Sequence, residues 1–205
     1  MVRRCKEDAE QTRLNILDAA RRVFVDRGVS RTTLSNVAKA AGVTRGAVYW
    51  YFKNKMDLFF AMREQISLPL VDEVESVFGP RPNGDPLAEI EQFLLSVLRV
   101  VERDATARAT FEIMTFKCEY VDELEPALAM QNECGEILVR KLKKIYERAR
   151  SAGVLDAATK PALAALGTHV FLVGLIRLWL LDHATTRRQA VQLISIHIAA
   201  HRRRD

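Results

Sequence analysis

The sequence predicts an all-α fold of nine helices arranged in two domains. Apolar residues recur every three to four positions in nearly every segment of the 205 residues. No segment sustains the alternation of apolar and polar residues that marks a strand. Three short predicted helices are followed by six longer ones, which places a domain boundary between residues 53 and 54. Hydrophobic residues make up 49% of the chain, enough for a sizeable core.

The three short helices are defined by their apolar faces and by signals at their ends. The first covers about residues 7–27, and Gly28 is a suitable stop. The second follows Thr33, a suitable N-cap, and ends at Gly42. The third follows Thr44, a second N-cap residue. Together they form the first predicted domain, residues 1–53.

The six longer helices form the second predicted domain, residues 54–205. They are expected at residues 54–78, 86–103, 105–118, 123–152, 160–181 and 187–203. Pro69 lies inside the first of these and predicts a kink, because proline lacks a backbone donor. The pattern Thr186-Arg-Arg-Gln189 predicts a capping box at the start of the last helix.

Composition and motifs exclude several classes of protein. Three cysteines without a Cys-x-x-Cys spacing argue against a disulfide framework or a structural zinc site, and favour a reducing cytosol. No apolar stretch reaches the roughly 18 residues needed to span a bilayer. The charged N-terminus shows no secretory signal. We therefore expect a protein that is neither exported nor embedded in a membrane.

The positive charge is concentrated near the N-terminus. Residues 1–60 hold 12 Lys and Arg against 6 Asp and Glu, whereas the other 145 residues hold 19 against 20. A basic segment in an otherwise near-neutral chain is typical of a surface that binds a polyanion. The alternative is a solubilising charged face.

Two short helices joined across Ala41-Gly42-Val43-Thr44 are typical of a helix-turn-helix. The second helix of such a unit enters the DNA major groove with its N-terminus first. Arg45 has the planar fork that pairs with guanine O6 and N7, and Gly46 allows the backbone to approach the bases. Hydroxyl, aromatic and ammonium groups nearby suit phosphate contacts. The residues expected to contact DNA are Thr44, Arg45, Gly46, Tyr49, Trp50, Tyr51 and Lys55. The alternative is a small three-helix core with an aromatic rim.

The stretch from Thr33 to Leu58 resembles the N-terminal signature of the tetracycline-repressor (TetR) family. The resemblance covers about residues 10–60 and adds Thr33 to the expected DNA contacts. It implies a dimeric regulator of double-stranded operator DNA in the bacterial cytoplasm, associated with the nucleoid when bound. Tyr51 stands where many members have histidine.

Three further stretches, residues 2–6, 116–120 and 174–181, are similar to multidrug-efflux repressors of the TtgR/AcrR type. This resemblance implies a repressor of a multidrug-efflux operon that leaves its palindromic operator when a hydrophobic effector binds. The helix expected over residues 54–78 joins the two domains and is the expected lever.

The resemblance also implies an effector site among the helices of the second domain. A mostly apolar lining with a few polar groups is typical of a small-molecule pocket. The expected lining residues are Ile66, Leu70, Phe93, Val97, Phe111, Met114, Thr115, Leu138, Leu172, Val173, Ile176 and Arg177. The efflux subgroup often has an acidic residue at the position of Val173. For each single residue, the alternative is an ordinary place in the core.

The last two predicted helices carry more apolar surface than one chain can bury. Leu163, Leu166, Val170 and Leu178 leave the first of them apolar on most of its circumference. This pattern predicts a homodimer through the last two helices, with two-fold symmetry that matches a palindromic operator. The alternative is a monomeric core.

The remaining patterns predict that the protein is not an enzyme and that it holds neither a cofactor nor a metal ion. His197 and His201 have a spacing that can bind metal, but neighbouring arginines would repel a cation, so we expect solvated surface histidines. No nucleophile, phosphate-loop or dinucleotide motif is present. Three alternative functions stay open: a regulator of metabolism or quorum signalling with an acyl-type effector, an architectural protein whose second domain only dimerises, and a redox sensor using Cys118 or Cys134.

Overall fold

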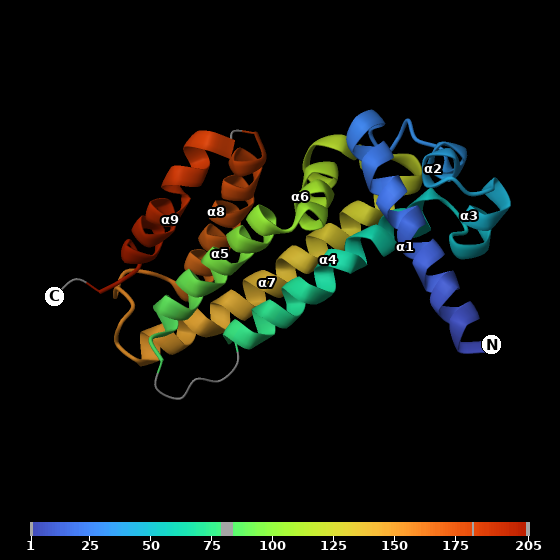
Figure 1. Cartoon of the computed structure of the whole chain (residues 1–205). Coiled ribbons are helices and arrows are strands. Elements are labelled where there is room, and N and C mark those ends of the chain that lie inside the picture. The colour runs from blue at the N-terminus through green and yellow to red at the C-terminus, as the bar shows by residue number, and fades with distance from the viewer. Residues whose placement is uncertain (1, 79–83, 182, 204–205) are drawn as a thin grey trace. The chain divides into compact units, whose positions relative to one another are not determined.

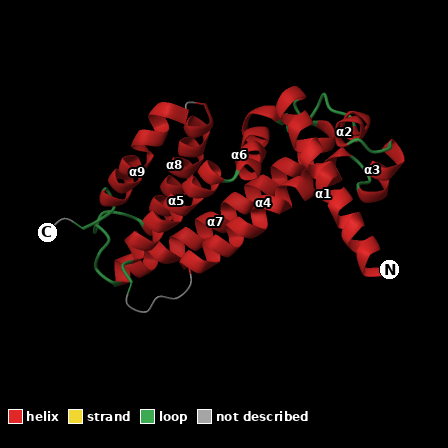
Figure 2. Cartoon of the chain, in the orientation of Figure 1, coloured by secondary structure: helices red, strands yellow, loops and turns green. Residues whose placement is uncertain are grey.

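The computed structural model describes residues 2–78, 84–181 and 183–203, with side chains for residues 7–66, 84–181 and 188–203. The described residues form nine α-helices and no β-strand (Figures 1 and 2), so the predicted all-α fold is confirmed. The helices are α1 (Val2–Arg27), α2 (Leu34–Ala41), α3 (Arg45–Tyr51), α4 (Lys55–Phe78), α5 (Pro86–Arg103), α6 (Ala105–Glu112), α7 (Glu125–Ser151), α8 (Pro161–Leu181) and α9 (His183–Ala199). A π-helical turn, η1 (Ile113–Lys117), and a 3-10 turn, η2 (Asp122–Leu124), lie between α6 and α7.

The chain divides into two compact units. The first contains residues 1–68 and 105–128, and the second contains residues 69–104 and 129–205. Helices α1, α2 and α3 therefore pack with the start of α4 and with α6. The predicted domain boundary between residues 53 and 54 stays a prediction.

The core of the first unit is built by α1, α2, α3 and the start of α4. The inner face of α1 contributes Leu17 and Phe24, and the ring of Phe24 lies 6.5 Å from that of Phe59 on α4. Helix α1 ends as expected at Gly28, which has a φ of +80° and whose N–H donates to the Phe24 carbonyl over 2.9 Å. The helix begins at Val2, earlier than predicted. Helices α2 and α3 pack against this core in a fixed position.

Helix α6 is shorter than the predicted helix over residues 105–118. It continues instead as the π-helical turn η1, whose wider backbone leaves carbonyl groups for other partners. The carbonyl of Lys117 accepts the N–H of Val29 at 2.8 Å, and the carbonyl of Met114 accepts the Tyr120 hydroxyl at 2.8 Å. The first bond ties η1 to the turn after α1, and the second holds Tyr120 against η1, both within the first unit.

The core of the second unit is shared by α5, α7, α8 and α9. Asp85 caps α5 by accepting from the Leu87 N–H over 2.9 Å. The carboxylate of Glu89 on α5 is buried, and it accepts two hydrogen bonds of 2.9 Å from the Arg148 guanidinium on α7. This two-pronged ion pair joins α5 to α7.

His197, on α9, and His201, just after it, differ from the prediction of solvated side chains. The ring of His197 stacks on Phe171 with centroids 4.3 Å apart, and its Nε2 lies 2.9 Å from the Thr168 hydroxyl. That hydroxyl lies 2.7 Å from the buried hydroxyl of Tyr146, whose ring packs edge-on against His201. Burial lowers the pKa of His197 to about 4 and also lowers the pKa of His201. The prediction was wrong because α7 and α8 supply aromatic cover that the α9 sequence does not show.

Helix α8 is a longer apolar stretch than was predicted. By length and composition alone it is long and apolar enough to cross a membrane, so the prediction that no stretch reaches this length was wrong. Gly167, Thr168 and His169 interrupt the apolar run without making the helix polar. A third of its most apolar window is buried inside the fold. Apolar helices of this kind also form the cores and interfaces of soluble bundles.

The ends of α9 also differ from the prediction. The helix begins at His183, so the predicted capping box at Thr186 is wrong, and Thr186 lies inside the helix. The helix ends at Ala199, and the N–H of Arg203 donates to the Val154 carbonyl at 2.9 Å. Helix α4 runs through Pro69, whose side chain lies outside the described residues, so the predicted kink stays a prediction.

Candidate nucleic-acid interface and effector residues

Helices α2 and α3 form a helix-turn-helix whose ends are capped by nearby side chains. The hydroxyl of Thr33 accepts from the Asn36 N–H at 3.2 Å, and the Asn36 side-chain oxygen accepts from the Thr33 N–H at 3.0 Å. Gly42 has a φ of +67°, a left-handed conformation that favours glycine. The hydroxyl of Thr44 accepts from the Ala47 N–H at 3.1 Å. Both predicted N-caps and the predicted turn glycine are confirmed.

The inner face of the helix-turn-helix is fixed to the core of the first unit. Val37, Val48 and Phe52 are buried there. The side-chain amide of Asn15 on α1 donates to the carbonyl of Ala41, at the end of α2, over 3.0 Å. Because these contacts hold one face of α3, its opposite face is presented to solvent in a defined orientation.

The outer face of α3 gathers five of the predicted DNA contacts. Thr44, Arg45, Gly46 and Tyr49 are exposed, and Trp50 is 74% exposed. The Arg45 guanidinium donates to the Tyr49 hydroxyl at 3.2 Å, and its Cζ lies 5.2 Å from the centre of the Tyr49 ring. The first turn of α3 carries no acidic residue. The arrangement offers hydroxyl, guanidinium and aromatic groups on one convex surface.

Two more predicted contacts flank this surface. Tyr51 is half-buried, and its ring meets the edge of the Trp50 ring at a centroid distance of 4.6 Å. Thr33 is exposed, but its hydroxyl already serves the capping box of α2. These two side chains are therefore less available to DNA than the exposed residues of α3.

Lys55 differs most from the expectation of an exposed phosphate contact. Its side chain is 11% exposed, its ammonium donates to the Ser30 carbonyl at 3.0 Å, and it lies 2.9 Å from a carboxylate oxygen of Glu123. A phosphate would therefore have to replace Glu123 as the counter-ion of Lys55. Sequence reasoning missed Glu123 because it approaches from η2, far along the chain.

The twelve predicted effector residues divide between the two units. The first unit contains Ile66, Phe111, Met114 and Thr115. The second contains Leu70, Phe93, Val97, Leu138, Leu172, Val173, Ile176 and Arg177. The side chain of Leu70 lies outside the described residues. The buried members are Ile66, Phe93, Val97 and Leu172.

The four candidates on α8 lie on two different faces of that helix. Leu172 is buried and Ile176 is partly buried, and these two share the inner face. Val173 and Arg177 are exposed within one chain, and lie on the outer face with Val170. The structure therefore groups Val173 and Arg177 with the residues predicted for dimerisation.

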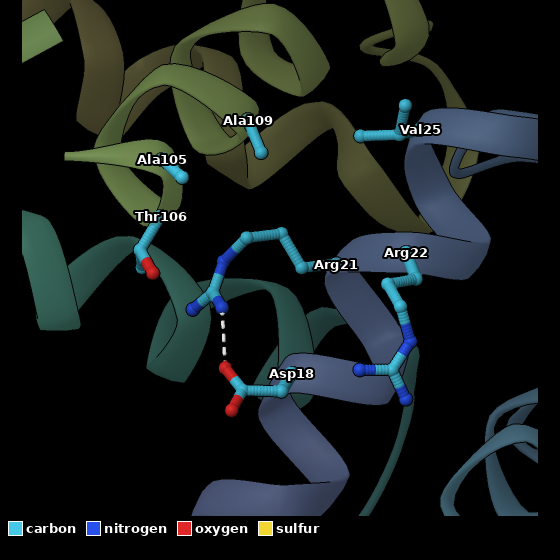
Figure 3. Close-up of a pocket in the computed structure, with 7 residues that line it drawn as sticks. All are labelled: Asp18, Arg21, Arg22, Val25, Ala105, Thr106 and Ala109. Carbon is cyan, nitrogen blue, oxygen red and sulfur yellow. Dashed lines mark hydrogen bonds and ion pairs between the residues drawn. The ribbon is translucent and has the colours of Figure 1, made fainter. Parts of the chain in front are cut away.

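A hollow of about 490 Å³ lies between α1 and α6 in the first unit (Figure 3). Its lining residues, none of them a predicted effector contact, are Asp18, Arg21, Arg22, Val25, Ala105, Thr106 and Ala109. The buried Arg21 guanidinium is held by Asp18 at 2.6 Å, by the Thr110 hydroxyl at 3.2 Å and by the side-chain oxygen of Gln65. These bonds join α1 to α4 and α6.

Cys118 and Cys134 form no disulfide and have different surroundings. Cys118 is half-buried, and this burial raises the pKa of its thiol to about 11, so the reactive thiolate is scarce at neutral pH. Cys134 is exposed and lies in the other compact unit. Among the described residues, no three His, Cys, Asp or Glu side chains are grouped as metal ligands.

Two family models match the chain. The model described as bacterial regulatory proteins of the tetR family matches residues 16–62, which contain the helix-turn-helix. The model described as the C-terminal region of MAATS-type transcriptional repressors matches residues 85–201, more than half of the chain. The chain belongs to the TetR family. Members of this family are transcriptional regulators, which bind operator DNA and small-molecule effectors and function as dimers.

Relatives of this TetR-family chain include regulators and solved structures. The HTH-type transcriptional regulator TtgR of Pseudomonas putida is 37% identical over 185 residues, which cover 88% of this chain and 86% of TtgR. NalD, the secondary repressor of the MexAB-OprM multidrug efflux pump in Pseudomonas aeruginosa, has a TM-score of 0.83 at 31% identity and covers 97% of this chain and 99% of its own. The complex of SmeT with triclosan has a TM-score of 0.80 at 28% identity. The match covers 94% of this chain and 92% of the SmeT chain.

Two features of this TetR-family helix-turn-helix were not foreseen from sequence. The pairing of Arg45 with Tyr49 follows from their spacing of four residues on a helix, so the signal was present. The ion pair of Lys55 with Glu123 left no local signal. Both features involve residues that were predicted to contact DNA.

Proposed function

We propose that the protein is a repressor of a multidrug-efflux operon that binds a palindromic operator as a homodimer. The observation that carries the DNA-binding part is the exposed, acid-free outer face of α3, seated on a rigid core. The efflux part is supported by NalD, which repeats the fold over nearly the whole chain and is described as an efflux-pump repressor. The nucleoid would then be the site of action when the operator is bound.

In the proposed complex, the N-terminus of α3 enters the major groove. Arg45 reads a guanine through its planar fork, and Gly46 leaves room for close approach of the backbone. Thr44, Tyr49, Trp50 and Tyr51 contact the sugar-phosphate backbone, with Thr33 at the edge. Lys55 joins them if a phosphate displaces Glu123.

The test of DNA reading is Arg45→Ala. We expect it to weaken operator binding by about 1–3 kcal/mol and to relax the base preference at one position in each half-site. Fluorescence anisotropy with the duplex protected in a footprint, and with single-base variants of it, measures both effects.

The matched control for this variant is Arg31→Ala. Arg31 is also exposed, but it lies outside α3 and donates to the Arg27 carbonyl. We expect at most a uniform loss of affinity from this change, without altered base preference. An Arg45→Ala protein that keeps the full base preference would show that α3 does not read the operator through Arg45.

The proposed homodimer rests on the outer faces of α8 and α9, which lie side by side in the second unit (Figure 1). Large apolar side chains are exposed there within one chain: Leu163, Leu166, Val170, Val173, Leu178, Leu181, Val191, Leu193 and Ile196. Exposed apolar surface of this extent is typical of a protein–protein contact. A two-fold contact would present two copies of α3 to half-sites about 34–36 Å apart.

We further propose that a hydrophobic effector releases the repressor from DNA. The apolar candidates of the second unit, on α5, α7 and α8, would form its site. The support is the structure of SmeT, described as a complex with triclosan, at 28% identity. Helix α4 contributes residues to both compact units, so we propose it as the element that transmits the change.

Effector release makes a quantitative prediction through thermodynamic linkage. If an effector weakens operator binding, the operator must weaken effector binding by the same factor, typically 5–150-fold. Calorimetric titration of triclosan into the free dimer and into the dimer saturated with operator duplex measures this factor.

The same titration distinguishes the alternatives. Identical triclosan affinities with and without operator would refute release by this compound. Saturable binding of a long-chain acyl compound, together with no response to triclosan, would favour the acyl-responsive regulator instead.

A further inference from the structure

Arg45 and Tyr49 make two contacts with each other on the outer face of α3. The guanidinium Nη2 donates to the Tyr49 hydroxyl at 3.2 Å. The guanidinium carbon also lies 5.2 Å from the centre of the Tyr49 ring, within the range of a cation–π contact. One residue pair therefore combines a hydrogen bond with a contact to the aromatic face.

The helix that carries this pair is held in place on its other side. Val48, between the two residues in sequence, is fully buried, and Thr44 caps the first turn. The spacing of four residues puts both side chains on one helical face. Among the described residues, Arg45 forms no ion pair with a carboxylate that would have to break before DNA binds.

We infer that Tyr49 is a positioning residue, which holds the Arg45 fork ready to read a base. This inference rests on the proposed DNA-reading role of α3 and goes beyond it. An arginine side chain has many rotamers and loses conformational entropy when a base fixes it. A tyrosine that already restricts the guanidinium reduces this loss at the moment of binding.

The hydroxyl chemistry of Tyr49 permits a second, simultaneous contact. When the phenolic oxygen accepts the Arg45 hydrogen bond, its own O–H is left to donate to a phosphate oxygen. Tyr49 would then connect a backbone phosphate to the base-reading guanidinium. A plain phosphate contact and a positioning role therefore predict different effects of the same mutations.

The experiment is a double-mutant cycle between residues 45 and 49, measured on three duplexes. The proteins are the wild type, Tyr49→Leu, Arg45→Ala and the double variant, and Tyr49→Phe isolates the hydroxyl. The duplexes are the footprinted operator, the same operator changed at the base pair whose preference is lost in Arg45→Ala, and an unrelated sequence of equal length.

If Tyr49 positions Arg45, Tyr49→Leu lowers the preference for the correct base pair by about three- to tenfold. Loss of its phosphate contact weakens binding to all three duplexes by a common factor, so the base preference, which is a ratio of affinities, isolates the positioning role. In the Arg45→Ala background the same substitution has no further effect on base preference. Tyr49→Phe, which keeps the ring, falls between Tyr49→Leu and the wild type.

The matched control is Trp50→Leu, which removes an exposed aromatic ring from α3 that has no recorded contact with Arg45. We expect it to weaken binding to all three duplexes by the same factor. Tyr49→Leu behaving like Trp50→Leu would overturn the positioning role, as would an unchanged effect of Tyr49→Leu without Arg45. A wild-type protein that binds the operator no more tightly than the unrelated duplex would instead overturn the proposed function itself. Because Tyr49 is exposed, unchanged thermal unfolding of Tyr49→Leu verifies that its fold is intact.

Discussion

Val170→Asp is expected to convert the protein from a dimer to a monomer and to lower its operator affinity about a hundredfold or more. Val170 lies on the outer face of α8 and is 63% exposed within one chain. In a two-fold contact it would meet the partner's copy of α8, so the substitution would bury two carboxylates without counter-ions. In a dimer, binding of one α3 holds the partner's α3 at a high effective concentration near the second half-site. A monomer lacks this advantage, so its operator affinity falls.

Sedimentation equilibrium at micromolar protein and an operator titration measure these two effects. The matched control is Val121→Asp, since Val121 is also exposed but belongs to the first unit, on the connection between η1 and η2. It should sediment as the wild type does. A Val170→Asp protein that remains dimeric would place the subunit contact on another surface, and a monomeric wild type would remove the dimer altogether.

The helix-turn-helix was the most predictable part of the molecule because its signals act over short distances. Thr33 and Thr44 cap helices within three residues of themselves, and Gly42 takes the left-handed conformation that a sharp turn needs. Such signals are complete in the sequence, so the caps and the turn were predicted correctly.

Contacts between distant segments were less predictable, since only the fold brings their partners together. Lys55 was expected to be exposed, but it forms an ion pair with Glu123. His197 was expected to be solvated, but its ring stacks on Phe171. The pattern of α8 predicted more apolar surface than one chain buries. It did not separate Leu172 on the inner face from Val173 on the outer face, because both are simply apolar in sequence.

The Glu89–Arg148 pair supplies the second large expected effect, which concerns stability. Glu89 is 3% exposed, and both its oxygens depend on the Arg148 guanidinium. Arg148→Met would leave this carboxylate buried without its partner. Removing one member of a buried pair costs about 3–5 kcal/mol, and the partial exposure of Arg148 puts the expected loss near the lower end, at about 3 kcal/mol. Urea unfolding at fixed protein concentration measures this loss, since the stability of a dimer depends on concentration.

Two companion variants identify the cause of that loss. Lys143→Met removes an ion pair with Glu147 on the same helix, but both of these side chains are about half exposed, so we expect a change below about 0.5 kcal/mol. Glu89→Leu combined with Arg148→Met removes the buried charge together with its partner, and it should recover most of the stability lost in Arg148→Met. The lost free energy would then belong to an uncompensated carboxylate. A double variant as unstable as Arg148→Met would instead indicate that the packing of the arginine stem between α5 and α7 accounts for the effect.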